Sequence, residues 1–157
     1  MSKKFYISDT HFGHYNIIEY SYRPFKTLKE MDSTLIENWN AKVRPNDLVY
    51  HLGDFAWKDA RKYREQLNGH IILIRGNHDK VPKNCFNEVC YYKEIKDSGY
   101  RLILMHYPLI TWNHVNSPTC YYLHGHLHIN STYHHKKRIN ISCELMGYEP
   151  KTIKEIL

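Results

Sequence analysis

Residues 71–79 have the sequence IILIRGNHD, in which a short apolar run ends at a glycine and three polar residues. Four aliphatic residues bounded by turn-forming residues are typical of a strand buried on both faces, as in a parallel sheet. Asn77, His78 and Asp79 then supply side chains that bind metals or transfer protons. The stretch therefore predicts a buried strand whose carboxyl end opens into a functional loop.

Two earlier apolar runs, at residues 5–7 and 48–52, are also predicted to be strands. Between them, a capping-box pattern at residues 27–30 precedes apolar residues at helical spacing as far as residue 43, which predicts an amphipathic helix. A second helix is predicted over residues 59–67, with Asp59 as its cap. The alternation of strands and helices predicts βαβ units and a parallel sheet.

The second half of the chain has a different pattern, with several strands and little helix between them. A hairpin is predicted over residues 93–105, because two strand-like runs flank the turn sequence Asp97-Ser98-Gly99. Further strands are predicted at residues 121–123 and 139–141, and a closing helix from Pro150 to Ile156. The sequence therefore belongs to the α/β class, with a second, less helical half.

Residues of the types that commonly bind metals follow the ends of five predicted strands. In open α/β sheets, ligands bind outside the carboxyl ends of the strands, so these residues are expected to meet in one crevice. Asp-x-His and His-x-His also place two side chains on the same side of an extended segment. The residues concerned are Asp9, His11, Asp54, Asn77, His106, His126 and His128.

The chemistry of these seven side chains predicts the kind of metal. Oxygen ligands mixed with imidazole nitrogen, and no thiolate, favour Mn, with Fe, Zn, Ni and Co as alternatives. Seven ligands are too many for one tetrahedral ion, so two divalent ions that share a bridging carboxylate are predicted. Paired ions of this kind activate a bridging hydroxide for attack on a phosphate ester.

The chain resembles the calcineurin-like metallophosphoesterase superfamily in the order of five motifs over residues 9–128, which are Asp9-Thr10-His11, Gly53-Asp54, Gly76-Asn77-His78-Asp79, His106 and Gly125-His126-Leu127-His128. The resemblance implies a four-layer α/β/β/α sandwich with a dinuclear site. It also implies that Asp54 bridges the two ions. The remaining ligands would be Asp9, His11 and His128 for one ion, and Asn77, His106 and His126 for the other.

The same resemblance implies roles for two residues that bind no metal. His78 would contact the phosphate and protonate or stabilise the leaving oxygen, and Asp79 would orient His78. No motif position departs from the family pattern. No cap is inserted between the motifs, so an open site is expected.

Four residues outside the motifs are candidates for substrate binding. His14 would either contact the substrate phosphate or support a ligand from behind. Arg75 would pair with the substrate phosphate or, as is slightly favoured, with a carboxylate in the core. Asn113 and His114 lie on a loop that is expected to overhang the crevice. His51, in mid-strand, is predicted to be a core or interface histidine and not a ligand.

Composition and charge limit the class of protein and of partner. Hydrophobic residues make up 42% and charged residues 24% of residues 1–157, which predicts a single globular domain. The formal charge of +6 favours anionic partners such as nucleotides or nucleic acid. Residues 134–138 form a basic run, for which a solvated hairpin turn is a commoner explanation than a nucleic-acid patch. The aromatic residues at 91–92, 112 and 121–122 are expected to face the core and not to stack on bases.

Location and redox state follow from the absence of certain patterns. No signal-peptide pattern and no apolar run of membrane-spanning length occur, so a cytoplasmic protein that does not span a membrane is predicted. The four cysteines lack metal-site spacing and are expected to be reduced packing residues. The oligomeric state is left open.

The leading functional hypothesis is a dinuclear metal-dependent phosphoesterase, with phosphodiesters of nucleotides or nucleic acid as the favoured substrates. One alternative is a phosphomonoesterase of the same fold, including a protein phosphatase. A second alternative is a catalytically inert module that binds nucleic acid or metal.

Overall fold

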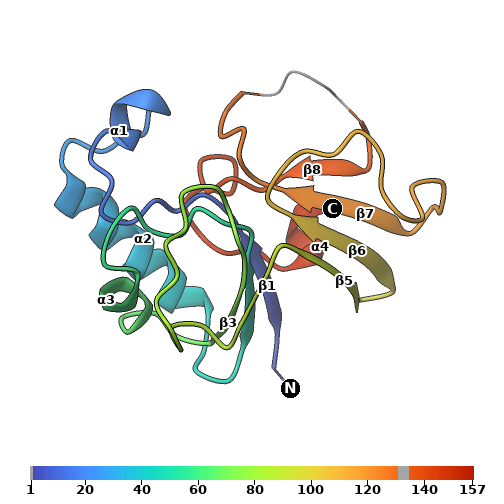
Figure 1. Cartoon of the computed structure of the whole chain (residues 1–157), viewed down its shortest axis with the longest axis horizontal. Coiled ribbons are helices and arrows are strands. Elements are labelled where there is room, and N and C mark those ends of the chain that lie inside the picture. The colour runs from blue at the N-terminus through green and yellow to red at the C-terminus, as the bar shows by residue number, and fades with distance from the viewer. Residues whose placement is uncertain (1, 131–134) are drawn as a thin grey trace.

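The first of two sheets contains the strands of the predicted βαβ units. The computed structural model describes residues 2–130 and 135–157. Four parallel strands form this sheet in the order β1-β2-β3-β4, and Figure 1 shows the sheet between helix α2 (Leu28–Lys42) and the second sheet. They are β1 (Lys4–Ile7), β2 (Leu48–His51), β3 (His70–Ile74) and β4 (Glu88–Cys90). The first three were predicted, whereas the short, largely exposed β4 was not, because it lacks an apolar run.

The predicted amphipathic helix covers one face of this sheet. Helix α2 (Leu28–Lys42) begins at Thr27, whose side chain accepts a hydrogen bond from the Glu30 N–H, and buries Met31, Leu35 and Trp39. The Glu30 carboxylate accepts from the N–H of Lys26 and not of Thr27, so the expected capping box is only half formed.

Two shorter helices flank α2. Helix α3 (Ala60–Arg64) is shorter than predicted, and Asp59 precedes it in the left-handed conformation, with φ of 52° and no capping hydrogen bond. Helix α1 (Ile17–Tyr20) was not predicted, because it is a single turn that buries Ile17 alone.

The second sheet begins with the predicted hairpin. Its order is β5-β6-β7-β8, with β5 antiparallel to β6 and the other pairs parallel. The closing helix α4 (Ile153–Ile156) starts after Thr152 and not at Pro150, because Thr152 forms a capping box with Glu155. The strands are β5 (Tyr92–Asp97), β6 (Tyr100–Met105), β7 (Cys120–His124) and β8 (Arg138–Asn140).

The two sheets share a core. Tyr6 and Ile72 from the first sheet belong to the same buried cluster as Leu104 and Leu123 from the second. The outer face of the second sheet is covered by Trp112, which lies in the non-helical segment 106–119. The α/β class is confirmed. In the described residues, however, this segment covers the face on which a fourth, helical layer was expected. Its two prolines and its turn-forming residues disfavour a helix.

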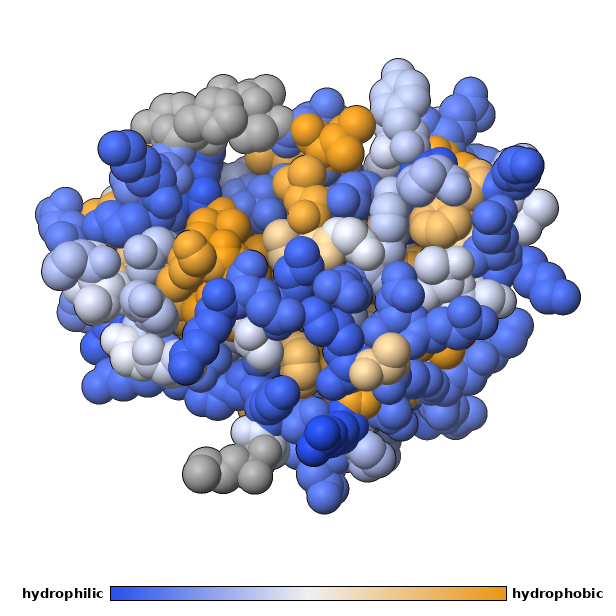
Figure 2. All heavy atoms as spheres, turned by 180° about the vertical axis from the view of Figure 1, so that it is seen from behind, coloured by the Kyte–Doolittle hydropathy of each residue, from blue (hydrophilic) through white to orange (hydrophobic). Residues whose placement is uncertain are grey.

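The remaining expectations on surface residues have mixed outcomes. Trp112 and Tyr122 are buried as predicted, whereas Tyr91 and Tyr92 are exposed, because β4 and β5 are edge strands. Most of the face in Figure 2 is hydrophilic, with apolar side chains in small groups. The part of the basic run at His134 lies outside the described residues. The four cysteines are free, and no described helix is long and apolar enough to span a membrane.

Candidate metal centre

The predicted ligands come together because the strands that precede them are parallel. Asp9 follows β1, Asp54 follows β2 and Asn77 follows β3, all at the same edge of the first sheet. His106 follows β6, and His126 and His128 follow β7, at the facing edge of the second sheet. Residues more than a hundred positions apart thereby become neighbours.

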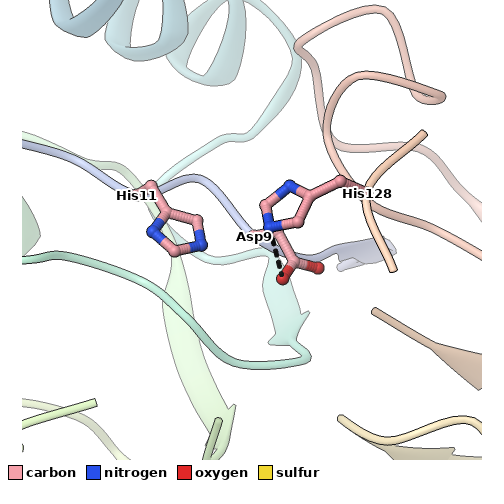
Figure 3. A group of neighbouring side chains, drawn as sticks. All are labelled: Asp9, His11 and His128. Carbon is pink, nitrogen blue, oxygen red and sulfur yellow. Dashed lines mark ion pairs between the residues drawn. The ribbon is translucent and has the colours of Figure 1, made fainter. Parts of the chain in front are cut away.

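One part of the cluster consists of Asp9, His11 and His128, each of which offers a ligand atom within 4.8 Å of the others. Figure 3 shows the three side chains pointing toward one another. Nε2 of His128 lies 3.8 Å from Oδ1 of Asp9. Burial raises the pKa of Asp9 and lowers the pKa of His11. The neutral imidazole of His11 therefore has a lone pair to offer.

The other part of the cluster centres on Asp54. Its Oδ2 lies 3.5 Å from Nε2 of His11 and 3.6 Å from Nε2 of His106, so this one oxygen lies between the two parts. Asn77 Oδ1 lies 3.0 Å from Nε2 of His106 and 3.1 Å from Nδ1 of His126. The seven predicted ligands thus lie in one cluster, in which Asp9 is also grouped with Asp54 and His106.

Contacts behind the histidines decide which ring nitrogen faces the cluster. Nδ1 of His106 donates to the Leu52 carbonyl oxygen at 2.7 Å, and Nδ1 of His128 donates to the Glu144 carboxylate at 2.9 Å. Each ring therefore turns Nε2 toward the cluster. Holding the outer ring nitrogen of a ligand in this way fixes its tautomer and orientation.

The donor set fits divalent cations. Nε2 of His11 is buried and has no hydrogen-bond partner. Nε2 of His106, whose proton is on the other nitrogen, faces the Asn77 carbonyl oxygen, so two acceptors lie 3.0 Å apart. A buried nitrogen without a partner and two facing lone pairs are both unfavourable unless a cation binds there.

The backbone around the cluster is strained. Asp9, His11, Asp54, His126 and His128 have φ values between 50° and 69°, in the left-handed region. Asp and His tolerate this region better than most residues, and such strain is common at functional sites. The adjacent backbone is also close: a Cβ at position 76 would overlap the Asp54 carboxylate, and one at position 125 would overlap that of Asp9, so only glycine fits at these two positions.

His78 and Asp79 lie beside the cluster but do not contact each other as expected. The Asp79 carboxylate accepts hydrogen bonds from the backbone N–H groups of Asp54, Phe55 and Gly76 at 2.8 to 2.9 Å. The expectation that Asp79 orients the His78 ring is therefore wrong, since both its oxygens are engaged with the loops that carry the ligands. Burial raises the pKa of Asp79 to about 6, although the N–H groups of Gly76 and Phe55 oppose the shift. The His78 ring is exposed and lines the cleft next to the cluster.

His14 lies beside the cluster, and a residue that the sequence did not reveal lies against it. Nδ1 of His14 is 3.1 Å from Nδ1 of His11, so a proton on His11 Nδ1 satisfies this contact and leaves Nε2 free. The Trp57 ring stacks on His14 with 4.2 Å between centroids. Both rings line a cleft of about 450 Å³ that includes His78 and His126.

The other three substrate-binding candidates lie elsewhere. Arg75 donates to the Asp79 carbonyl oxygen and to the Tyr91 hydroxyl, so it pairs neither with a core carboxylate nor with the cleft. Asn113 donates to the Glu94 carboxylate. His114 lines a separate hollow beside the β5–β6 turn, at the opposite end of the strands. The overhanging loop was a wrong expectation, because the segment folds back onto the outer face of its sheet.

A buried ion pair behind His128 was not predicted. The Arg23 guanidinium lies 2.8 Å from the Glu144 carboxylate, with the two side chains 0% and 3% exposed. Arg23 also donates to the carbonyl oxygens of Thr10 and Asp9 at 2.9 and 2.7 Å. Burial would raise the pKa of Glu144, but the hydrogen bond from His128 and the charge of Arg23 hold it below its usual value. No motif marks either residue, so only the fold reveals the pair.

Glu144→Gln is expected to lower metal affinity by roughly 10- to 100-fold, the usual effect of removing a partner that orients a ligand histidine. It should also lower the free energy of unfolding by on the order of 3 kcal/mol, since the Arg23 charge stays buried. Metal titration calorimetry and denaturant unfolding measure the two effects. Glu149→Gln, which removes a half-exposed partner of Lys42, is the control and should cost less than about 1 kcal/mol. Equal behaviour of the two variants would contradict the role of Glu144.

The His51 expectation is confirmed. Its ring is fully buried and contacts the Thr10 hydroxyl at 2.9 Å, and it belongs to neither group of possible metal ligands among the described residues. Burial lowers its pKa to about 3.

Comparisons with known proteins agree with this arrangement. A family model for the calcineurin-like phosphoesterase superfamily domain matches residues 3–143. An uncharacterized protein of Methanocaldococcus jannaschii is 40% identical over 168 residues, which cover all of this chain and 90% of the relative. The gene 66 protein of Mycobacterium phage L5 is 25% identical over 94% of this chain and 89% of its own length. A crystal structure of a protein of unknown function from Aquifex aeolicus superimposes with a TM-score of 0.79 and 32% identity, over 99% of this chain and 98% of that one.

Proposed function

The chain belongs to the calcineurin-like phosphoesterase superfamily and is a metal-dependent phosphoester hydrolase, and we propose that it hydrolyses phosphodiesters of nucleotides or nucleic acid. One observation carries this proposal. Two groups of possible ligands, each with oxygen and imidazole donors, lie on either side of one carboxylate oxygen of Asp54. The cleft beside this cluster has a volume of about 450 Å³, which is large enough for a small-molecule substrate. We further propose that residues 1–157 act as one domain.

In this proposal two divalent ions are held by the seven ligands. Asp9, His11 and His128 would hold one, Asn77, His106 and His126 would hold the other, and Asp54 would contribute to both. The mixture of carboxylate, amide and imidazole favours Mn, with Fe, Zn, Ni and Co as alternatives. When bound, such a pair activates water and neutralises charge on the phosphate.

The protein's own residues provide the remaining parts of the reaction. The exposed His78 ring lines the cleft beside the cluster, where it would protonate or stabilise the leaving oxygen. Asp79 holds the two ligand loops through their backbone N–H groups. It is therefore a positioning residue and does not touch the substrate.

The positive charge of the chain supports a polyanionic diester over a phosphomonoester, because the formal charge is +6 before any metal binds. A phosphomonoesterase of the same fold is the second candidate, and its substrates would be cleaved faster than diesters of the same leaving group. An inert binding module is the third, and it predicts no turnover with any metal.

Removing metal with a chelator is expected to abolish hydrolysis while the protein stays folded. Separate apolar clusters cover both faces of the first sheet, so the core does not depend on the ions. The loss of hydrolysis is measured with monoesters, diesters, cyclic nucleotides and single-stranded nucleic acid as substrates. Each is assayed before and after readdition of Mn, Ni, Co, Zn or Mg. Circular dichroism shows whether the protein stays folded in chelator.

Full activity in chelator would contradict the metal requirement. Unfolding in chelator would contradict the independence of the core. A preference for monoesters across the panel would replace the proposed substrate class without affecting either conclusion.

A further inference from the structure

Trp57 separates two hollows in the surface. On one side is the cleft that contains His78 and the ligand cluster, with a volume of about 450 Å³. On the other side is a hollow of about 420 Å³ lined by residues 56–61, Lys80 and Pro82. Because Trp57 borders both, a ligand that extends from the cleft into the second hollow passes this residue.

The indole is held in place by its surroundings. The backbone N–H of Trp57 donates to the Phe12 carbonyl oxygen at 2.9 Å, and its ring lies nearly parallel to that of His14, with 12° between the planes. The ring centroid is also 5.3 Å from that of His78. The residue nevertheless remains 39% exposed, whereas Trp39 and Trp112 are buried. A fixed and accessible aromatic ring is what a stacking site for a base requires.

The second hollow is basic. Lys58, Arg61 and Lys80 line it and are exposed, against a single carboxylate, that of Asp59. Among the described residues none of the three cations forms an ion pair, and Arg61 donates only to the Lys83 carbonyl oxygen. Three cations without carboxylate partners form a site that favours a phosphate group.

We propose that Trp57 and this basic hollow form a second binding site, which takes one base and the following phosphate of a single-stranded nucleic acid whose scissile phosphate lies at the ligand cluster. The inference rests on the proposed phosphodiesterase function and specifies its substrate class. The order along the surface is cluster, aromatic ring, cations. The order along a nucleic-acid strand is phosphate, base-bearing sugar, phosphate.

A single strand fits this order better than a duplex or a mononucleotide. The bases of a duplex are stacked on each other and do not reach an indole ring. A mononucleotide has no second phosphate for the hollow. The combination of a positive groove with a stacking ring is typical of proteins that bind single strands without sequence preference.

The test measures binding of a fluorescein-labelled oligothymidylate of about twelve nucleotides to the full chain in chelator, by fluorescence anisotropy at several salt concentrations. Lys58→Ala/Lys80→Ala should weaken binding and reduce the magnitude of the slope of log K against log salt by about 0.7, since the hollow takes one phosphate and each phosphate contact on a single strand contributes about 0.7. Trp57→Leu should weaken binding by roughly 5- to 150-fold, the usual effect of losing one base stack, and Trp57→Phe should restore part of it.

The matched control is Lys29→Ala/Lys62→Ala, which removes the same charge from a different hollow and should change the salt slope little. The Lys58/Lys80 variant should still hydrolyse bis(p-nitrophenyl) phosphate with Mn as fast as the wild type, because this diester has no second phosphate.

The proposal is overturned if the two double variants bind the oligonucleotide equally, if Trp57→Leu binds like the wild type, or if thymidine monophosphate competes as well as the oligonucleotide. Failure of the wild type to hydrolyse the small diester would contradict the proposed function instead. The hydrolysis assay and the binding assay in chelator are separate measurements, so failure of the proposed function can be distinguished from failure of the second binding site.

Discussion

Asp54→Ala should remove both metal ions and all measurable hydrolysis. One Asp54 oxygen lies within 3.6 Å of ligand nitrogens from both parts of the cluster, His11 on one side and His106 on the other. Loss of a shared carboxylate therefore weakens both coordination spheres, whereas loss of an unshared ligand weakens one. Elemental analysis of dialysed protein after loading with Mn measures the metal content directly.

Alanine at this position also meets backbone strain, because Asp54 has φ of 53°. Asn84→Ala is the matched control, since Asn84 has φ of 57° on an exposed loop outside the cluster. The control should keep two ions per chain. An Asp54→Ala protein that retains two ions would mean that Asp54 is not shared, and the assignment of the ligands would have to be changed.

His78→Ala should retain both ions and lose roughly 10²- to 10⁴-fold in turnover, the usual contribution of a positioned general acid. Only the backbone N–H of His78 contacts the Asp54 carboxylate, at 3.0 Å, and this contact survives the substitution. The ring itself faces the cleft. Steady-state turnover, together with metal content, separates the loss of chemistry from the loss of binding.

The leaving group should decide how large the His78 effect is. A nitrophenolate departs with little protonation, so an activated aryl ester should be cleaved comparatively well by the variant, whereas a nucleoside linkage should be cleaved very poorly. His114→Ala, at the opposite end of the strands, should affect neither substrate. Equal losses on both substrates would favour phosphate positioning over proton donation, and loss of an ion would show that His78 supports the metal centre.

The sequence was sufficient to predict the strands that carry the ligands, because each is a continuous apolar run that ends at a polar loop. The meeting of Asp9 with Asp54 follows from that order, since they come after neighbouring parallel strands of one sheet, whereas the approach of His128 to Asp9 depends on how the two sheets pack. The chemistry of the cluster was likewise predictable, as it depends on residue types and their order along the chain.

The partners of those ligands were not predictable in the same way. Arg23 and Glu144 are 121 positions apart and have no motif, and their pairing depends on where two irregular segments cross. The role of Asp79 was mistaken because sequence adjacency to His78 suggested a contact, whereas the turn directs its carboxylate to the backbone of the Asp54 loop. Trp57 was overlooked because its position beside His14 depends on a single bridge between Phe12 and Ala56.

Two buried charged groups hold the ligand loops in place through hydrogen bonds to their backbone, and these bonds involve no ion. The Arg23 guanidinium holds the carbonyl oxygens of Asp9 and Thr10, and the Asp79 carboxylate holds the amides of Asp54 and Gly76. Because these contacts are made by the chain alone, the ligand side chains are gathered before a cation binds, and little conformational entropy is left to lose when it does.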